Sequence, residues 1–194
     1  MRTFVAIDVH DKNIEKFQDF LIKKFNFNLR FIKPIKGNNL HLTIKFLGEK
    51  TDDELNDIIY DLKKITFDSF RIIFNNVGVF PHIKSPRIIW LGLDDESNRK
   101  LSDLYLQIDN VLKKYEGIRN EDTISKSGVQ KFSPHLTLFR INKYDKIPNF
   151  PPQLSEEIIS ERTVDTIILK KSTLTPTGSI YSDLFSIYAN HKDE

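Results

Sequence analysis

Residues 39–44 read Asn-Leu-His-Leu-Thr-Ile, and residues 133–138 repeat the pattern as Ser-Pro-His-Leu-Thr-Leu. In each copy a histidine and a threonine two positions later alternate with apolar residues. Because residues i and i+2 of a strand share a face, this spacing predicts a strand that carries its polar pair on one face and its apolar pair on the other. The repeat predicts two related halves whose histidines, His41 and His135, face one cleft.

The periodicity around these copies predicts an α+β fold. Apolar residues at three- and four-residue steps predict helices over residues 13–25, from Thr51 onward, and over residues 97–115. The run Thr51-Asp52-Asp53-Glu54 has the spacing of a capping box, which marks a helix start. Short runs rich in apolar residues, several of them alternating, predict strands over residues 3–9, 69–79, 87–93, 135–141, 163–171 and 182–188. Several strands follow one another closely, which favours a largely antiparallel arrangement.

Composition bounds the class of protein. The chain has 194 residues, which suits a single domain over residues 1–194, and its net charge of +2 gives little reason to expect a long polyanion on its surface. A short phosphorylated end remains compatible with that charge. The chain contains no cysteine, which fits a reducing compartment, and no apolar run long enough for a membrane span. We therefore expect a cytoplasmic protein that forms a monomer and does not contact membranes.

Two imidazoles beside one phosphorus atom suit phosphodiester cleavage. In-line displacement needs a base on the incoming oxygen and an acid on the leaving oxygen, and histidine titrates close enough to neutrality to serve as either. The hydroxyls of Thr43 and Thr137 can donate hydrogen bonds to the non-bridging oxygens. Arg140 has a guanidinium suited to phosphate, but its odd spacing from His135 places it on the opposite face unless a bulge returns it.

Other interpretations of these residues exist. A single His-X-Thr in a strand is more often structural than catalytic, and it is the second copy that favours chemistry. Paired histidines can also bind metal, but neither copy has His-X-His or His-Glu-X-X-His spacing, and we interpret Glu49, Asp52 and Asp53 as a helix start. The sequence thus predicts neither a metal site nor a cofactor.

Beyond the two copies, the chain resembles the 2H phosphoesterase superfamily, and within it the RNA 2′,3′-cyclic phosphodiesterase family, historically called 2′-5′ RNA ligase. The resemblance covers nearly the whole chain in five ordered blocks: residues 1–7, residues 39–49, residues 78–81 with 86–92, residues 132–140, and residues 172–181. Phe139 departs from the family, which usually has a small residue there, and we expect it to narrow the cleft or offer a stacking surface. Ser179 stands where the family usually has Gly-Pro.

This resemblance implies a bilobal fold in which two largely antiparallel sheets face a central cleft, with helices outside and pseudo-two-fold symmetry. It implies metal-independent hydrolysis of RNA 2′,3′-cyclic phosphate ends to 2′-phosphates. By the same resemblance His41 is the proton donor and His135 the proton acceptor, while Thr43, Thr137 and Arg140 bind the phosphate. The implied partners are RNA ends or nucleotides that carry a 2′,3′-cyclic phosphate.

Two further functions use the same residues. The family resemblance implies a weaker, reversible 2′-5′ ligation of RNA ends, for instance of tRNA halves. A non-catalytic module that captures RNA ends through the same histidines and threonines is the third hypothesis. The spacing of the residues supports a symmetric phosphate site in all three cases, whereas the RNA substrate rests on the resemblance.

Overall fold

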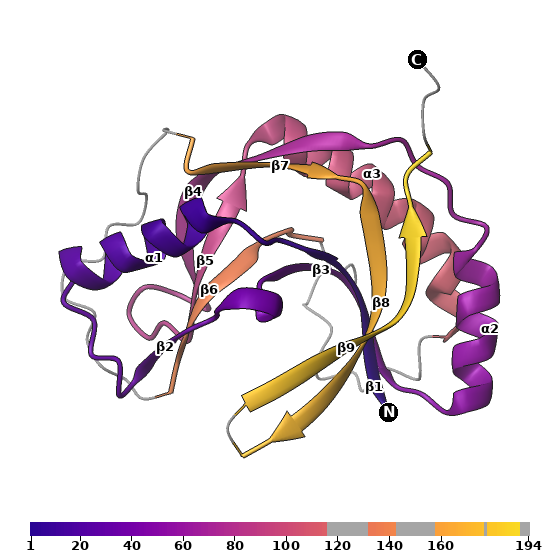
Figure 1. Cartoon of the computed structure of the whole chain (residues 1–194), viewed down its shortest axis with the longest axis horizontal. Coiled ribbons are helices and arrows are strands. Elements are labelled where there is room, and N and C mark those ends of the chain that lie inside the picture. Colours follow the sequence, from indigo (N-terminus) through magenta and orange to yellow (C-terminus); the bar gives the residue numbers. More distant parts are fainter. Residues whose placement is uncertain (116–131, 143–157, 177, 191–194) are drawn as a thin grey trace.

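A computed structural model of the protein describes residues 1–115, 132–142, 158–176 and 178–190 (Figure 1). The α-helices of this part are α1 (Lys12–Lys24), α2 (Asp52–Leu62) and α3 (Asp95–Leu112), with short 3-10 turns at Gly37–Asn39 and Lys113–Tyr115. The strands are β1 (Arg2–Asp8), β2 (Ile32–Pro34), β3 (His41–Glu49), β4 (Phe70–Phe80), β5 (Ile88–Leu93), β6 (Leu136–Ile141), β7 (Ser160–Val164), β8 (Thr166–Thr175) and β9 (Gly178–Tyr188).

The strands form one nine-stranded sheet in the order β7-β4-β5-β6-β3-β1-β8-β9, and β2 pairs with β6. All the pairings between these strands are antiparallel, which confirms the predicted α+β class. The two sheets expected from the resemblance are the two halves of this single sheet. They are joined between β3 and β6 at one register pair, Leu42 with Leu136. Figure 1 shows the sheet bent into an arch around that junction.

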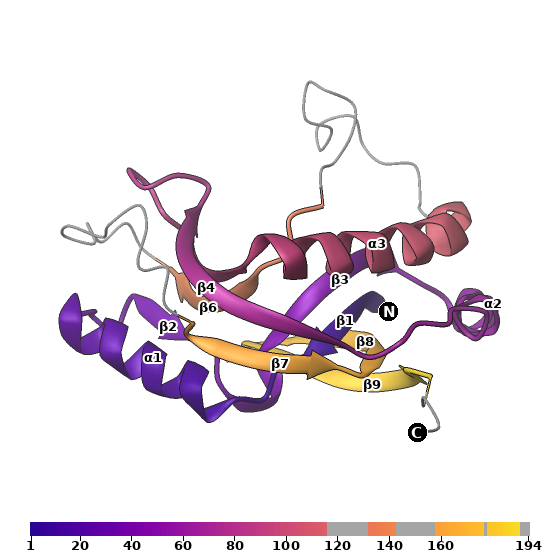
Figure 2. The ribbon, with the colours of Figure 1, turned by 90° about the horizontal axis from the view of Figure 1, so that it is seen from above.

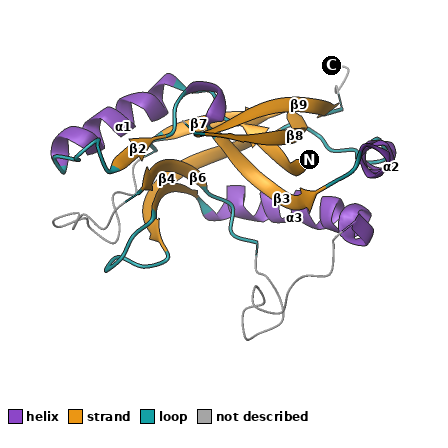
Figure 3. Cartoon of the chain, turned by 90° about the horizontal axis from the view of Figure 1, so that it is seen from below, coloured by secondary structure: helices purple, strands orange, loops and turns teal. Residues whose placement is uncertain are grey.

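The helices lie outside the arch, as predicted. Figures 2 and 3 show α3 running across one side of the sheet and α1 on the other side, beside β2. Helix α2 packs against α3. No helix in the described ranges combines the length and the hydropathy that a membrane crossing requires.

The helix starts are set by side-chain caps. Thr51 and Glu54 form the predicted capping box at the start of α2, with each side chain bonded to the backbone N–H of the other residue. Asp11 caps α1 and Asp94 caps α3, and like Thr51 both residues have an extended backbone conformation. The predicted helix over residues 97–115 begins two residues earlier than expected, at Asp95, where the side chain of Asp94 accepts a hydrogen bond from the backbone N–H of Ser97.

Two strands differ from expectation. The segment predicted as one strand over residues 163–171 is divided at Asp165 between β7 and β8, which pair with opposite ends of the sheet. Strand β2 was not predicted, because Ile-Lys-Pro is too short to show alternation. The stretch over residues 143–153 is rich in proline and charged residues, which predicts a loop, and it lies outside the described residues.

Gln18, a buried residue of α1, connects the segment that follows β2 to strand β6 through hydrogen bonds. Its side chain is 2% exposed, and its Nε2 donates hydrogen bonds to the carbonyls of Ile35 (2.8 Å) and Leu138 (2.9 Å). Ile35 in turn donates its backbone N–H to the Leu138 carbonyl at 2.8 Å. One buried amide thus holds the segment after β2 against β6.

Replacing Gln18 with Leu should therefore destabilise the protein while keeping the helix face apolar. Two buried carbonyls lose their side-chain donor, so we expect a loss of about 1–3 kcal/mol in the free energy of unfolding. Urea denaturation of Gln18→Leu against wild type measures it, with Asp19→Asn on the exposed side of α1 as the control. A stability equal to that of wild type would show that Gln18 does not hold β2.

Candidate active site

The junction between β3 and β6 brings the two His-X-Thr copies side by side. Leu42 and Leu136 are directly paired and fully buried, so the residues on either side of each face the other surface of the sheet. In an antiparallel ladder one step in each direction sets His41 across from Thr137 and Thr43 across from His135. The structure thus places all four predicted polar residues around one point on the junction, as the repeat predicted.

Both histidines are held by the same kind of hydrogen bond. The Nδ1 atom of His41 lies 2.8 Å from the carbonyl oxygen of Asn39, and the Nδ1 atom of His135 lies 2.8 Å from the carbonyl oxygen of Ser133. A carbonyl oxygen only accepts, so Nδ1 carries the hydrogen in each ring. This leaves Nε2 of each histidine to accept a proton in the neutral form or to donate one in the charged form.

Aromatic rings flank each histidine. The ring of His41 lies 5.1 Å from that of Phe4 and 5.0 Å from that of Tyr181, whereas the ring of His135 lies 5.0 Å from that of Phe80. These ring contacts restrict the rotation of the two imidazoles. All three aromatic residues lie in the blocks that resemble the family, but composition alone did not single them out from the other Phe and Tyr residues.

Trp90 completes the surroundings of His135 at a ring separation of 6.2 Å. It lies so close to the next strand that a Cβ atom on Gly78 would meet its ring at 2.2 Å. Gly78 and Trp90 are register partners in β4 and β5, so only a glycine leaves room for the indole there. The Trp90 Nε1 atom is buried and has no hydrogen-bond partner within the described residues.

A bulge in β6 returns Arg140 to the face of the site. The pairing of β5 with β6 steps from Ile89–Phe139 to Trp90–Thr137 and leaves Leu138 without an opposite residue. A bulge of this kind shifts the alternation of side chains by one position. Arg140 is exposed, on the same face as Thr137, and its charge acts on His41.

The same bulge corrects the expectation for Phe139. Its side chain is 0% exposed and packs edge-on against Phe27 at a ring separation of 5.3 Å. Phe139 is therefore a core residue beneath the sheet and neither narrows the site nor stacks a base. The prediction was wrong because simple alternation, without the bulge, places Phe139 on the face of His135.

Strand β3 has the matching bulge. Its pairing with β1 steps from Val5–Lys45 to Ala6–Thr43, so Ile44 lacks an opposite residue, three positions after His41 just as Leu138 is three positions after His135. The two halves thus share the bulge as well as the His-X-Thr spacing. The position equivalent to Arg140 is occupied by Phe46, which is 71% exposed.

An ion cluster around the buried Lys170 lies beside His41. Asp8 is the register partner of His41, and its Oδ2 accepts a hydrogen bond from Lys170 Nζ at 2.9 Å, while Asp183 Oδ1 accepts another at 2.6 Å. Lys170 is 3% exposed. Burial opposes its charge, but the two carboxylates outweigh burial and raise the pKa of Lys170. Asp8 Oδ1 is buried with no partner in the described part of the chain.

Burial lowers the pKa of His41 below its usual value of 6.5. The hydrogen bond to Asn39 and the carboxylate of Asp8 act in the opposite direction, and the charges of Lys170 and Arg140 add to the lowering. His41 is thus neutral in the free protein near pH 7. A negative charge that approaches His41 favours its protonated form.

The carboxylates weighed as metal ligands have structural partners. Glu49 lies 3.4 Å from the N-terminal amine, and Asp52 and Asp53 stand in the first turn of α2. No group of three or more His, Asp or Glu side chains in the described ranges is arranged to hold a metal ion.

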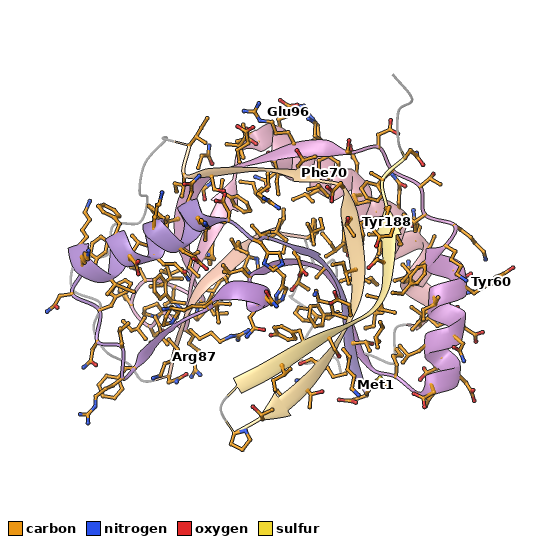
Figure 4. The ribbon with its side chains drawn as sticks, in the orientation of Figure 1. Met1, Tyr60, Phe70, Arg87, Glu96 and Tyr188 are labelled. Atoms are coloured by element: carbon orange, nitrogen blue, oxygen red, sulfur yellow. The ribbon has the colours of Figure 1, made fainter. Side chains whose placement is uncertain are left out.

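The two halves of the sheet can be located in Figure 4 by two labelled residues. Arg87, just before β5, lies on the left of the view, and Met1, just before β1, lies on the right. A model of the family described as LigT like Phosphoesterase matches residues 19–90. The chain is 36% identical to a protein of Archaeoglobus fulgidus named RNA 2′,3′-cyclic phosphodiesterase, over 95% of this chain and 98% of that protein.

A second protein with that name, from Thermotoga maritima, is 34% identical over 95% of this chain and 94% of its own. Among solved structures, a protein of Thermus thermophilus matches with a TM-score of 0.72 and 25% identity over 98% of this chain and all of its own. E. coli LigT complexed with 3′-AMP has the same fold, with a TM-score of 0.75 at 22% identity over 98% of both chains. The chain belongs to the LigT-like phosphoesterase family of the 2H superfamily.

The environment of His41 can be tested by titration. His41 should titrate below 6.5 in the free protein, because burial disfavours the charged ring. Asp8→Asn should lower its midpoint further, since it removes the carboxylate that opposes burial. NMR titration of the imidazole signals measures both shifts, with Asp19→Asn as a matched charge control. A midpoint that rises or stays unchanged in Asp8→Asn would contradict this electrostatic account.

Proposed function

We propose that this protein hydrolyses the 2′,3′-cyclic phosphate at RNA ends to a 2′-phosphate, without a metal ion, by an acid and base mechanism in which His41 donates and His135 accepts the proton. The observation that carries the proposal is the matched pair of imidazoles. Each has Nδ1 tied to a carbonyl two residues earlier, so each presents Nε2 as its reactive nitrogen. Relatives at 36% and 34% identity, named for this activity, support the choice of substrate.

In the proposed reaction a water oxygen attacks phosphorus and forms a new P–O bond while the bond from phosphorus to the 3′ oxygen breaks. Nε2 of His135 takes the proton of the attacking water, and Nε2 of His41 gives a proton to the departing 3′ oxygen. The hydroxyls of Thr43 and Thr137 and the guanidinium of Arg140 hold the non-bridging oxygens. The product is a 2′-phosphate with a free 3′ hydroxyl, and proton exchange with solvent resets both rings.

The electrostatics around His41 suit the donor role once substrate is bound. A donor must be protonated, yet burial lowers the pKa of His41 in the free protein. The cyclic phosphodiester brings a negative charge to the site, which acts with the Asp8 carboxylate to favour the imidazolium. The substrate thereby promotes the protonation state that its own cleavage requires.

Three further properties accompany this function as predictions. The chain acts as a single bilobal domain over residues 1–194, as a monomer, in the cytoplasm. The continuous sheet across the β3 and β6 junction supports one domain, and the absence of cysteine from the sequence fits a reducing compartment. Gel filtration of the purified protein measures the oligomeric state.

The hydrolysis is tested with an oligonucleotide ending in a 2′,3′-cyclic phosphate, in the presence of EDTA. We expect a 2′-phosphate product, identified by ³¹P NMR, at a rate that chelation does not change. His41→Ala and His135→Ala should each lower kcat by about 10²- to 10⁴-fold, because each removes one proton-transfer group.

His82→Ala serves as the control, since this histidine is exposed and its side chain forms a hydrogen bond with Ser85, away from both His-X-Thr copies in the sequence. It should keep the wild-type rate. Near wild-type turnover in either His41→Ala or His135→Ala would sink the two-histidine mechanism. Activity that disappears on chelation would overturn metal independence, and tight binding without turnover would indicate a binding module instead.

A further inference from the structure

Two positive charges face each other at the edge of the site. Lys33 in β2 is the register partner of Arg140 in β6, and both side chains are exposed. Like charges directly opposite each other in neighbouring strands are destabilising. Within the described residues neither side chain lies within ion-pair distance of a carboxylate. The fold thus keeps two positive charges close together, and an anion bound between them would reduce their repulsion.

The backbone around Lys33 is firmly held, so the pairing is not an accident of a loose loop. The Asn142 N–H donates to the Phe31 carbonyl at 2.8 Å, and the Ile35 N–H donates to the Leu138 carbonyl at 2.8 Å. Ile32 is 2% exposed and points into the core. Its neighbour Lys33 therefore projects from the opposite surface, which is the one that carries Arg140 and the site.

The charged groups beside the site differ between its two halves, although the whole chain is nearly balanced, with 29 basic and 27 acidic side chains. In the half that holds His41, the acids Asp8 and Asp183 share the single charge of Lys170. The side of β2 and β6 instead carries the positive pair. An anionic chain that leaves the phosphate site is accordingly attracted towards β2.

We propose that Lys33, beside Arg140, forms a second phosphate subsite that binds the backbone phosphate preceding the terminal cyclic phosphate of an RNA. The inference rests on the proposed function, and it adds the preference for an oligonucleotide over a single nucleoside cyclic phosphate. Arg140 is engaged by the terminal phosphate, and Lys33 stands one strand further out, about 5 Å away along the sheet. A lysine ammonium on a long, flexible stem suits a backbone phosphate whose exact position varies with the base.

The subsite is tested with two substrates that differ by one nucleotide, an adenosine with its phosphodiester: adenosine 2′,3′-cyclic phosphate and the dinucleotide ApA ending in a 2′,3′-cyclic phosphate. Lys33→Gln should lower kcat/KM for the dinucleotide by about two- to fivefold, as for an exposed ion pair. It should leave kcat/KM for the nucleoside substrate unchanged. The slope of log kcat/KM against log salt should fall by about 0.7 for the dinucleotide only, as one phosphate contact is lost.

Matched variants separate this effect from a general change of charge. Lys16→Gln, on the exposed face of α1, removes the same charge far from Lys33 in the sequence and should leave kcat/KM unchanged for both substrates. Lys33→Arg should keep the dinucleotide preference. A nucleoside 2′,3′-cyclic phosphate that carries a 5′-phosphate separates recognition of the phosphate from recognition of the preceding nucleoside. If Lys33→Gln lowers kcat/KM for this compound, the phosphate alone is recognised.

The outcomes distinguish the subsite from the function on which it rests. If wild type hydrolyses both substrates and Lys33→Gln affects them equally or not at all, the subsite is wrong and the proposed function stands. If wild type hydrolyses neither substrate, both proposals fall. Circular dichroism of Lys33→Gln, with an unfolding midpoint at or above that of wild type because an unfavourable like-charge pair is removed, confirms that the variant is folded.

Discussion

The structure depends on one register pair, Leu42 against Leu136, where the two halves of the sheet meet. Both leucines are fully buried, so the core selects this pairing, and a slip of either strand by one residue would turn the histidine of that strand into the core. The pairing thereby couples hydrophobic burial to function: the apolar face fixes the register, and the register brings two imidazoles to one point. Equivalent bulges at Ile44 and Leu138 then decide which later side chains share that surface.

The symmetry of the backbone contrasts with the asymmetry of the charges it carries. After equivalent bulges, one half presents the exposed ring of Phe46 and the other the guanidinium of Arg140. Beside His41 a buried lysine binds two carboxylates, whereas Arg140 faces Lys33. Two imidazoles with the same hydrogen-bonding geometry can thus take different roles, because the surrounding charges differ. This division agrees with a reaction in which one ring gives a proton and the other takes one.

Much of this arrangement could be predicted from the sequence. Alternation within each His-X-Thr copy was enough to pair the polar side chains, and the capping box marked the start of α2. The position of Arg140 depends on a bulge, and a bulge follows from cross-strand pairing that residue spacing does not reveal. Without the bulge, simple alternation placed Phe139 on the face of the site instead of in the core. Asp8 and Lys170 lie at opposite ends of the chain, and only the pairing of β1 with β8 brings them together. Local patterns therefore predicted which side chains come together at the candidate site, while their electrostatic surroundings needed the tertiary structure.

A crystal structure with a 2′-phosphorylated nucleotide, the expected product, tests the central claim most directly. The account predicts phosphorus between the Nε2 atoms of His41 and His135, with the hydroxyls of Thr43 and Thr137 donating to its oxygens. A phosphate that binds away from the Leu42–Leu136 junction, or that contacts only one of the two histidines, would contradict it.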